Sequence, residues 1–243
     1  MLNDNLTPNH TSIQDYNHAN WITRRRILRF LLKTIAFPFL VKLDRVEGIN
    51  NIPTKGPAIL YFNHIAFVDP IILVYIVPRD IVPLAKIEVY DYPIIGIFPK
   101  IWGVIPVRRE EVDRRAVRQA LAVLQAEEIL LLAPEGTRHP QMSQAKVGLA
   151  YLAVKTSAPL VPVAIEGTKG FPAFRLSNRW RQDGGIVRFG KPFHFRSDIG
   201  RVDHQMLRKM ADEAMYILAA MLPEHLRGYY SNLSLATDNY IQW

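Results

Sequence analysis

The chain has 243 residues, of which 49% are hydrophobic and 21% are charged, a balance typical of a globular protein and not of a disordered one. Its 30 basic residues against 22 acidic residues give a formal net charge of +8, which favours an anionic partner or simply a basic surface in water. Cysteine is absent, which excludes disulfide bonds, thiolate zinc sites and cysteine nucleophiles.

The N-terminal part divides into a polar tail, residues 1–22, and a basic and apolar segment, residues 23–43. The tail lacks the charged and apolar regions of a secretory signal. The apolar run of the second segment is interrupted by Arg29, Lys33 and Pro38, whereas a membrane-spanning helix needs about 20 mostly apolar residues. Arg29 and Lys33 share one helical face, which predicts a membrane-interfacial helix with its cationic side toward anionic headgroups. The alternative is a helix packed on the domain, with its basic stripe in water.

From residue 44 to residue 243 we expect one domain in which strands and helices alternate. Short apolar runs predict strands at residues 58–62, 81–85, 104–107, 129–133, 160–165 and 186–189. Helical periodicity predicts helices at residues 70–77, 110–128, 146–155 and 203–221, the first with Asp69 as its N-cap. Because the strands are apolar on both faces, the expected fold is α/β, with a mainly parallel central sheet flanked by helices. The run at residues 92–107 is read as buried core or, alternatively, as an acyl-chain groove or bilayer contact.

His64 and Asp69 follow the strand predicted at residues 58–62. Open α/β sheets usually hold their ligands at the carboxyl ends of strands. A carboxylate five residues after a histidine can fold back onto the imidazole, fix its tautomer and stabilise the imidazolium. The pair then suits a general base that deprotonates a hydroxyl. Alternatively, Asp69 only caps the next helix and His64 is an ordinary loop residue.

Three further motifs lie next to predicted strands. Arg108 and Arg109 end the strand at residues 104–107, and residues 134–138 (PEGTR) follow the strand at residues 129–133. The glycine of this second motif permits a tight turn with exposed N–H groups, and its arginine can bind a phosphate in bidentate fashion. The third motif, residues 161–168 (VPVAIEGT), ends another strand with a turn. In this order the motifs are more specific than any one of them alone.

Together these residues resemble the glycerolipid acyltransferase family, which includes 1-acyl-glycerol-3-phosphate acyltransferases. The family's four motifs are matched, in chain order, by His64 and Asp69 with Asn63 before them, by Gly103 and Arg108, by Glu135, Gly136, Thr137 and Arg138, and by Val161, Pro162 and Val163. The third motif usually opens with Phe and closes with Ser, whereas Ala133 and His139 stand in those places here. The resemblance covers about residues 45–190.

The resemblance implies an O-acyltransferase of phospholipid biosynthesis that uses no metal and no bound cofactor. His64 is then the general base, oriented by Asp69, and the fatty acyl group comes from acyl-CoA or acyl-acyl carrier protein. The implied phosphate-binding residues are Arg108, Glu135, Gly136, Thr137 and Arg138. The secondary candidates for anion contact are Asn63, Lys86, Arg109, His139 and Lys146. The expected partners are a lysophospholipid acceptor and an anionic membrane surface on the cytoplasmic face, and no nucleic acid.

Several alternatives stay open. Within the same reaction class, the acceptor could be glycerol 3-phosphate, another lysophospholipid or a glycolipid. From another class, a non-catalytic membrane-bound lipid-binding protein of the same fold is the main rival. The sequence lacks the Gly-x-Ser-x-Gly motif of serine hydrolases, and it lacks P-loop and dinucleotide fingerprints and familiar nucleic-acid-binding motifs.

Overall fold

The structure is a computed structural model that describes residue 17 and residues 19–93, 95–108 and 113–243. Its α-helices are α1 (Ala19–Leu31), α2 (Phe37–Leu40), α3 (Asp69–Ile76), α4 (Ile97–Trp102), α5 (Arg114–Gln125), α6 (Gly148–Thr156) and α7 (His204–Ala220). Its strands are β1 (Leu43–Glu47), β2 (Ala58–Phe62), β3 (Ile81–Lys86), β4 (Ile105–Val107), β5 (Ile129–Leu132), β6 (Leu160–Glu166), β7 (Gly185–Phe189), β8 (His194–Phe195) and β9 (Ile241–Gln242). A π-helical turn, η1 (Leu32–Ala36), joins α1 to α2, and the connections carry the 3-10 helices η2 (Ile49–Asn51), η3 (Ile87–Asp91), η4 (Asn178–Arg181), η5 (Glu224–Leu226), η6 (Gly228–Tyr230) and η7 (Leu233–Leu235).

A central sheet of seven strands has the order β1-β7-β6-β2-β5-β3-β4. The five strands β6, β2, β5, β3 and β4 are parallel to one another, β7 is antiparallel to β6, and β1 is parallel to β7. The predicted α/β fold with a mainly parallel sheet is therefore confirmed. The carboxyl ends of β6, β2, β5, β3 and β4 meet at one edge of the sheet, where ligands bind in open α/β folds.

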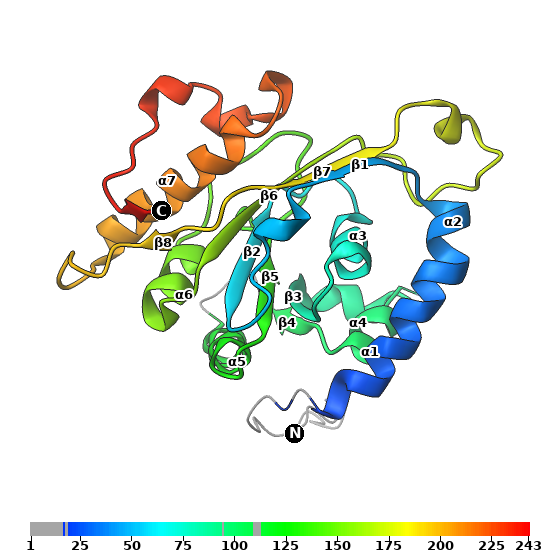
Figure 1. The fold of residues 1–243 in the computed structure, drawn as a ribbon, viewed down its shortest axis with the longest axis horizontal. Coiled ribbons are helices and arrows are strands. Elements are labelled where there is room, and N and C mark those ends of the chain that lie inside the picture. Colours follow the sequence, from blue (N-terminus) through cyan, green and yellow to red (C-terminus); the bar gives the residue numbers. More distant parts are fainter. Residues whose placement is uncertain (1–16, 18, 94, 109–112) are drawn as a thin grey trace, which may run out of the picture.

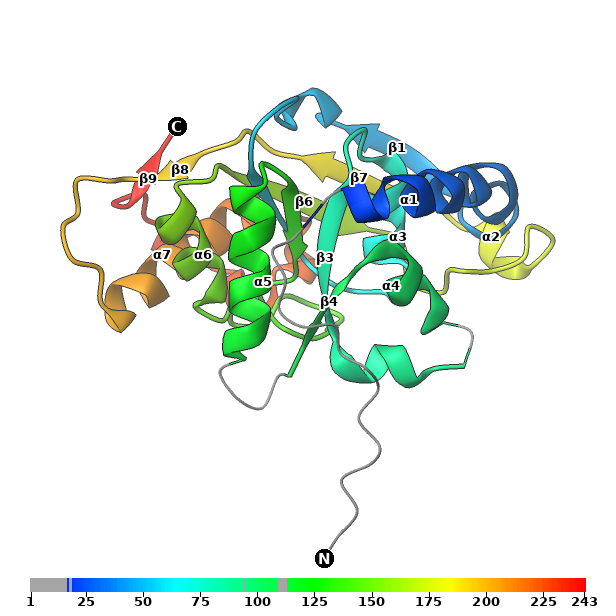
Figure 2. The same ribbon diagram turned by 90° about the horizontal axis from the view of Figure 1, so that it is seen from below.

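Helices cover both faces of this sheet (Figures 1 and 2). Helices α5, α6 and α7 pack on the face to which β2 contributes Ile59 and Tyr61. Helices α3 and α4 and the N-terminal helix pack on the opposite face, to which β2 contributes Leu60 and Phe62. Successive side chains of a strand point to opposite faces, so a strand buried on both sides must be apolar throughout. This explains why residues 58–62 (AILYF) form one continuous apolar run.

The elements differ from the predicted ones in a few places. Strands β1, β8 and β9 and helix α4 were not predicted. Helix α5 begins after its N-cap Asp113, whose side chain accepts hydrogen bonds from the backbone N–H groups of Arg115 and Ala116. The helix is therefore shorter than the predicted range of 110–128. Residues 109–112 lie outside the described residues. Helix α3 has Val68, not Asp69, as its N-cap. Most of the predicted tail also lies outside the described residues, and the division of the chain at residues 22 and 43 stays a prediction.

The N-terminal helix runs without a break through α1, η1 and α2, from Ala19 to Leu40. Pro38 has no N–H to donate to the preceding turn, and a π-helical turn just before it is one way in which a helix accommodates such a residue. None of the helices among the described residues is long and apolar enough to cross a membrane.

Two arginines of this helix point toward the domain, so the predicted outward cationic face is wrong for Arg29. The Arg29 guanidinium donates to the Val77 carbonyl (2.9 Å) and to Asp80 Oδ1 (3.0 Å), and the buried Arg25 donates from Nε to the Trp102 carbonyl (2.9 Å). Val77 is the C-cap of α3, where carbonyls lack helical partners and attract cations. The helix packs on the domain, as the alternative expects, and Lys33 is exposed, but Arg29 is not part of a basic stripe in water.

The outward face of the N-terminal helix is instead largely apolar. The exposed large hydrophobic residues of this helix are Ile22, Ile27, Phe30, Leu31, Ile35 and Phe39. Arg24, Arg26 and Lys33 are exposed beside them. The helix is therefore held to the domain by the charged groups of Arg25 and Arg29 and by buried apolar side chains such as Leu32 and Phe37. Its outward side presents a band of apolar side chains to the surroundings.

Candidate active site

His64 lies in the loop that leaves the carboxyl end of β2, and Asp69 is the first residue of α3, which follows that loop. The His64 Nδ1 atom is 3.0 Å from Asp69 Oδ2. The Asp69 side chain is completely buried, while that of His64 is 14% exposed. Since a carboxylate can only accept, this hydrogen bond selects the Nδ1–H tautomer of a neutral imidazole, which leaves the lone pair on Nε2. The geometry is that of a histidine prepared to accept a proton at Nε2.

The Asp69 carboxylate is held by more than the imidazole. Its Oδ2 atom also accepts hydrogen bonds from the backbone N–H groups of Ile65 (2.8 Å) and Ala66 (2.7 Å). These donors lie before α3, so the carboxylate faces the loop and does not cap the helix. Its Oδ1 atom accepts from the Thr168 hydroxyl at 2.6 Å. Every oxygen of this buried charge is therefore hydrogen-bonded, which is what makes its burial tolerable.

Thr168 is a site residue that the sequence did not reveal as one. It is completely buried and lies 99 positions after Asp69, in the turn that follows β6. The available signal was positional, because β6 is hydrogen-bonded to β2 in parallel and both strands end at the same edge. The threonine fixes the carboxylate from the side opposite the histidine.

The loop after β5, which contains Glu135–Arg138, is joined directly to the His64 loop. The backbone N–H of His139 donates to the His64 carbonyl at 3.0 Å. Gly136 has a φ of +76°, and a Cβ atom there would lie 3.0 Å from Lys146 Cε. The glycine thus permits both the turn and the close approach of the lysine. The two motifs form one continuous surface beside the histidine.

Glu135 is turned into this loop and away from solvent. Its Oε2 atom accepts hydrogen bonds from the Ser143 backbone N–H (2.6 Å) and hydroxyl (3.0 Å), and only 5% of the residue is exposed. Burial raises the pKa of the Glu135 carboxyl above its usual value, against the opposing effect of the Ser143 hydrogen bonds. These contacts brace the loop from within and leave Thr137 and Arg138 exposed at its surface.

Arg138 and Arg108 follow different strands, β5 and β4. The Arg138 guanidinium carbon lies 5.9 Å from the centre of the Phe67 ring, and no carboxylate of the described residues forms an ion pair with Arg138. Glu166, the last residue of β6, pairs with Arg188 at 2.6 Å and not with Arg138. Arg108 is exposed at the end of the edge strand β4. Since β3 lies between β4 and β5, the carboxyl ends of β4, which Arg108 follows, and of β5, which Arg138 follows, are about 10 Å apart across the sheet.

The secondary candidates occupy varied places. Both groups of the buried Asn63 amide bond the Ile165 backbone at 2.8 Å, so this residue joins the ends of β2 and β6. Lys86 forms an ion pair with Glu88 at 2.8 Å. Lys146 covers the Gly136 turn, as described above, and His139 is exposed beside it. Arg109 lies outside the described residues.

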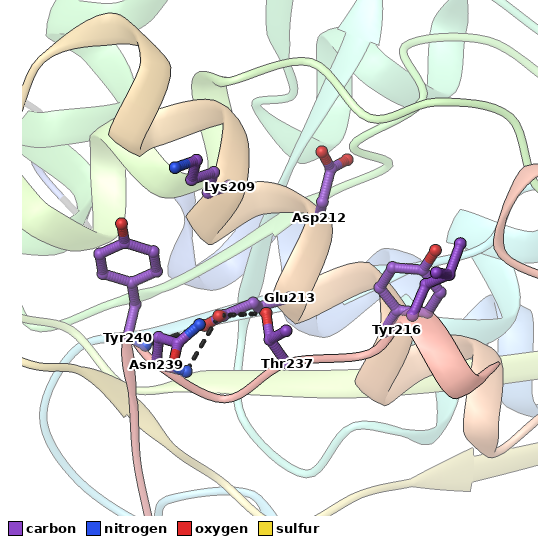
Figure 3. A pocket seen from close by; sticks show the side chains of 8 residues that line it. Lys209, Asp212, Glu213, Tyr216, Thr237, Asn239 and Tyr240 are labelled. Carbon is purple, nitrogen blue, oxygen red and sulfur yellow. Dashed lines mark hydrogen bonds between the residues drawn. The ribbon is translucent and has the colours of Figure 1, made fainter.

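A surface pocket between α7 and the C-terminal segment lies apart from these motifs (Figure 3). Its central carboxylate, Glu213, accepts hydrogen bonds from the Thr237 hydroxyl and from the backbone N–H groups of Asn239 and Tyr240. These contacts fasten the C-terminal segment to α7, so the Glu213 carboxylate already has its partners. Within the described part of the chain, no cluster of three or more histidines and acids could hold a metal ion.

Comparison with known proteins identifies the same region. A family model described as acyltransferase matches residues 44–166. The chain is 33% identical over 130 residues to a 1-acyl-sn-glycerol-3-phosphate acyltransferase of Borreliella burgdorferi, covering 52% of each chain. It is 32% identical over 124 residues to the enzyme of that name from Bacillus subtilis, covering 51% of this chain and 62% of the relative. The chain therefore spans less than two thirds of the length of these relatives.

A solved structure shares the fold. The crystal structure of the 1-acyl-sn-glycerophosphate acyltransferase PlsC from Thermotoga maritima superposes with a TM-score of 0.54 at 25% sequence identity. The match covers 78% of this chain and 75% of that one. It extends well beyond the residues of the family model, so the similarity includes more of the fold than the four motifs alone.

Proposed function

Because this chain belongs to the acyltransferase family, whose model it matches over residues 44–166, we propose that it moves a fatty acyl group onto the free hydroxyl of 1-acyl-glycerol-3-phosphate, making phosphatidate. The donor is an acyl thioester, either acyl-CoA or acyl-acyl carrier protein. The names of the bacterial relatives support the acceptor. The observation that carries the proposal is the His64–Asp69 pair, hydrogen-bonded at 3.0 Å beside the Gly136 loop.

The proposed reaction is direct transfer without an acyl-enzyme. His64 Nε2 takes the proton of the acceptor hydroxyl as the oxygen forms a bond to the thioester carbonyl carbon. The tetrahedral intermediate then collapses, the carbon–sulfur bond breaks, and the imidazolium returns its proton to the departing thiolate. Asp69 stabilises the imidazolium in between, because its carboxylate already lies against Nδ1. General-base catalysis of this kind contributes about 10²–10⁴-fold in rate.

The phosphate of the acceptor is assigned to the exposed groups of the same edge. Arg138 is close to the histidine through the His139–His64 hydrogen bond and makes no ion pair with a described carboxylate. A guanidinium in that position matches a phosphate monoester with paired N–H donors. Thr137 and the Gly136 turn are placed to help, whereas Glu135 supports the loop. Arg108 follows β4, whose end is about 10 Å from the end of β5, which Arg138 follows. We therefore assign Arg108 to the outer part of the phosphate site or to binding of the acyl donor.

The acceptor lies in a bilayer, and the N-terminal helix supplies the contact. We assign its exposed apolar band, which includes Ile27, Phe30 and Ile35, to the acyl boundary of the membrane. Arg24, Arg26 and Lys33 then reach anionic headgroups, each worth about 1 kcal/mol near such a surface. The protein is thus peripheral or monotopic on the proposed cytoplasmic face, where the acyl thioesters are supplied. This assignment keeps the predicted interfacial helix, but Arg29 faces the domain and not the lipid headgroups.

An acceptor panel tests the proposal. Purified protein is supplied with acyl-CoA or acyl-acyl carrier protein and with lysophosphatidate, glycerol 3-phosphate or lysophosphatidylcholine in mixed micelles. We expect phosphatidate from lysophosphatidate, and a much lower rate when the phosphate carries choline. Faster acylation of glycerol 3-phosphate or of lysophosphatidylcholine would contradict the acceptor assignment.

A further inference from the structure

The connection between β6 and β7 leaves the sheet and projects from the molecule beside α2 (Figures 1 and 2). It comprises residues 167–184 and carries Phe174 and Leu176 near its tip. Phe174 is 77% exposed and Leu176 is 95% exposed, more than any other large hydrophobic residue of the described chain. Two apolar side chains so fully in water, separated by one arginine, mark an interaction surface.

This connection is held in shape by its own hydrogen bonds. The Arg179 guanidinium donates to the backbone carbonyls of Lys169 (2.7 Å) and Asp183 (2.8 Å), which ties the two stems together. The Trp180 indole N–H donates to the Ala173 carbonyl at 2.6 Å. The exposure of the tip is therefore built into the fold, and little further ordering is needed when a partner binds.

The charge of the connection identifies the partner as anionic. Its charged residues are Lys169, Arg175, Arg179, Arg181 and Asp183, four basic against one acidic. Lys169, Arg175 and Arg181 are exposed, and Arg175 stands between the two apolar residues of the tip. Apolar side chains flanked by cations suit a membrane interface, where the hydrocarbon boundary takes the former and lipid phosphates take the latter.

The connection also adjoins the face already assigned to the bilayer. The Ala173 backbone N–H donates to the Leu40 carbonyl at 2.9 Å, so the tip begins where α2 ends. Ile35 and Phe39 of the N-terminal helix are exposed on the approach to this junction. The connection and α2 lie on the same flank of the molecule in both views (Figures 1 and 2).

We propose that the tip of the β6–β7 connection is a second membrane anchor, which inserts Phe174 and Leu176 into an anionic bilayer while Lys169, Arg175 and Arg181 contact lipid phosphates. A single small anchor gives marginal, reversible membrane binding, and two anchors on one rigid body bind far more firmly. The connection leaves β6 through Thr168, whose hydroxyl donates a hydrogen bond to Asp69. The anchor thus fixes the height of the catalytic edge above the membrane. The inference rests on the proposed membrane location and not on the identity of the acceptor.

Co-sedimentation of the full chain with vesicles of phosphatidylglycerol and phosphatidylcholine tests this anchor. The double variant Phe174→Ser/Leu176→Ser, called the tip variant, removes the two apolar side chains of the tip. Leu235→Ser is the matched control, since Leu235 is 63% exposed in the C-terminal segment. We expect the tip variant to partition about tenfold more weakly than the wild type, the loss from withdrawing two partly inserted side chains. The Leu235→Ser variant should bind like the wild type.

A site-specific label gives a second measurement. The chain has no cysteine, so Leu176→Cys and Leu235→Cys each provide a single attachment point for an environment-sensitive fluorophore. Vesicles should shift the emission of the label at position 176 to the blue and leave the label at position 235 unchanged. Unchanged partitioning of the tip variant, or an unshifted label at position 176, would overturn the anchor and leave the tip for a protein partner. Because both measurements need no turnover, a failure of the acyltransferase proposal would appear separately.

Discussion

Replacing Asp69 by Asn removes the charge behind His64 while keeping the shape of the site. The two backbone N–H donors of Ile65 and Ala66 point at Oδ2, so they hold the amide oxygen there and turn the amide nitrogen toward Thr168. The Thr168 hydroxyl can rotate to accept from that nitrogen. His64 then keeps its hydrogen bond and its tautomer. The variant isolates the electrostatic role of the carboxylate, which a simple truncation cannot do.

The size of the effect follows from the geometry. With Nδ1 and Oδ2 3.0 Å apart, the imidazolium and carboxylate charges are centred roughly 4 Å apart, and at an effective dielectric constant of about 20 they attract by about 4 kcal/mol. Losing that attraction when the imidazolium forms predicts a fall in kcat of about 10³-fold. The free energy of unfolding should fall by no more than about 2 kcal/mol, since the hydrogen bonds persist with a neutral acceptor.

The assay is the formation of labelled phosphatidate from lysophosphatidate at saturating donor, with thermal unfolding as the measure of folding. A reversed tautomer would cost about 10⁴-fold instead, as it does when asparagine replaces the triad aspartate of a serine protease. Turnover within a few-fold of the wild type in a folded Asp69→Asn protein would refute the electrostatic reasoning.

Three further changes test neighbouring residues. Arg138→Lys keeps the charge but loses the paired donors, so KM for lysophosphatidate should rise about tenfold while lysophosphatidylcholine is unaffected; equal effects on both would exclude phosphate binding. Thr168→Val leaves Asp69 Oδ1 without its donor and should cost about 1–3 kcal/mol of stability and part of kcat, both restored by Thr168→Ser; a silent valine variant would show that the hydroxyl is dispensable. The raised pKa of Glu135 means that the folded state favours the protonated acid, so its contribution to stability is full below pH about 4.5 and is lost as pH rises through the raised pKa. Glu135→Gln, which keeps an acceptor for Ser143, should therefore be at least as stable as the wild type at neutral pH in thermal unfolding, with its advantage vanishing in acid; a destabilised glutamine variant would mean that the charge itself is required.

Much of the fold could be predicted because the central strands are buried on both faces. Runs such as residues 58–62 and 129–132 are apolar throughout and stand next to turn residues, so their positions were clear. Strand β1 was missed because residues 43–47 (LDRVE) are mostly charged and exposed, and only pairing with β7 makes them a strand. The direction of β7 also depends on its neighbours and not on its own sequence.

The motif residues of the site could be predicted from the sequence, but the residues that hold them in place could not. His64 and Asp69 are only five residues apart, so their spacing alone suggested a contact. Thr168 is 99 residues away from Asp69, and only the pairing of β6 with β2 brings it there. The inward turn of Arg29 had the same kind of cause, because the Val77 carbonyl that it binds belongs to the end of α3. Helical periodicity places a residue on a face but does not say what that face meets.

The most direct test of the central claim compares the wild type with His64→Ala in the acylation of lysophosphatidate. The side chain lies in a loop and is partly exposed, so its removal should leave the thermal unfolding transition nearly unchanged. We predict that the wild type forms phosphatidate from at least one of the two thioester donors and that the folded alanine variant forms essentially none. Phosphatidate formation by the variant at a rate near that of the wild type, or none by the wild type with either donor, would contradict the account.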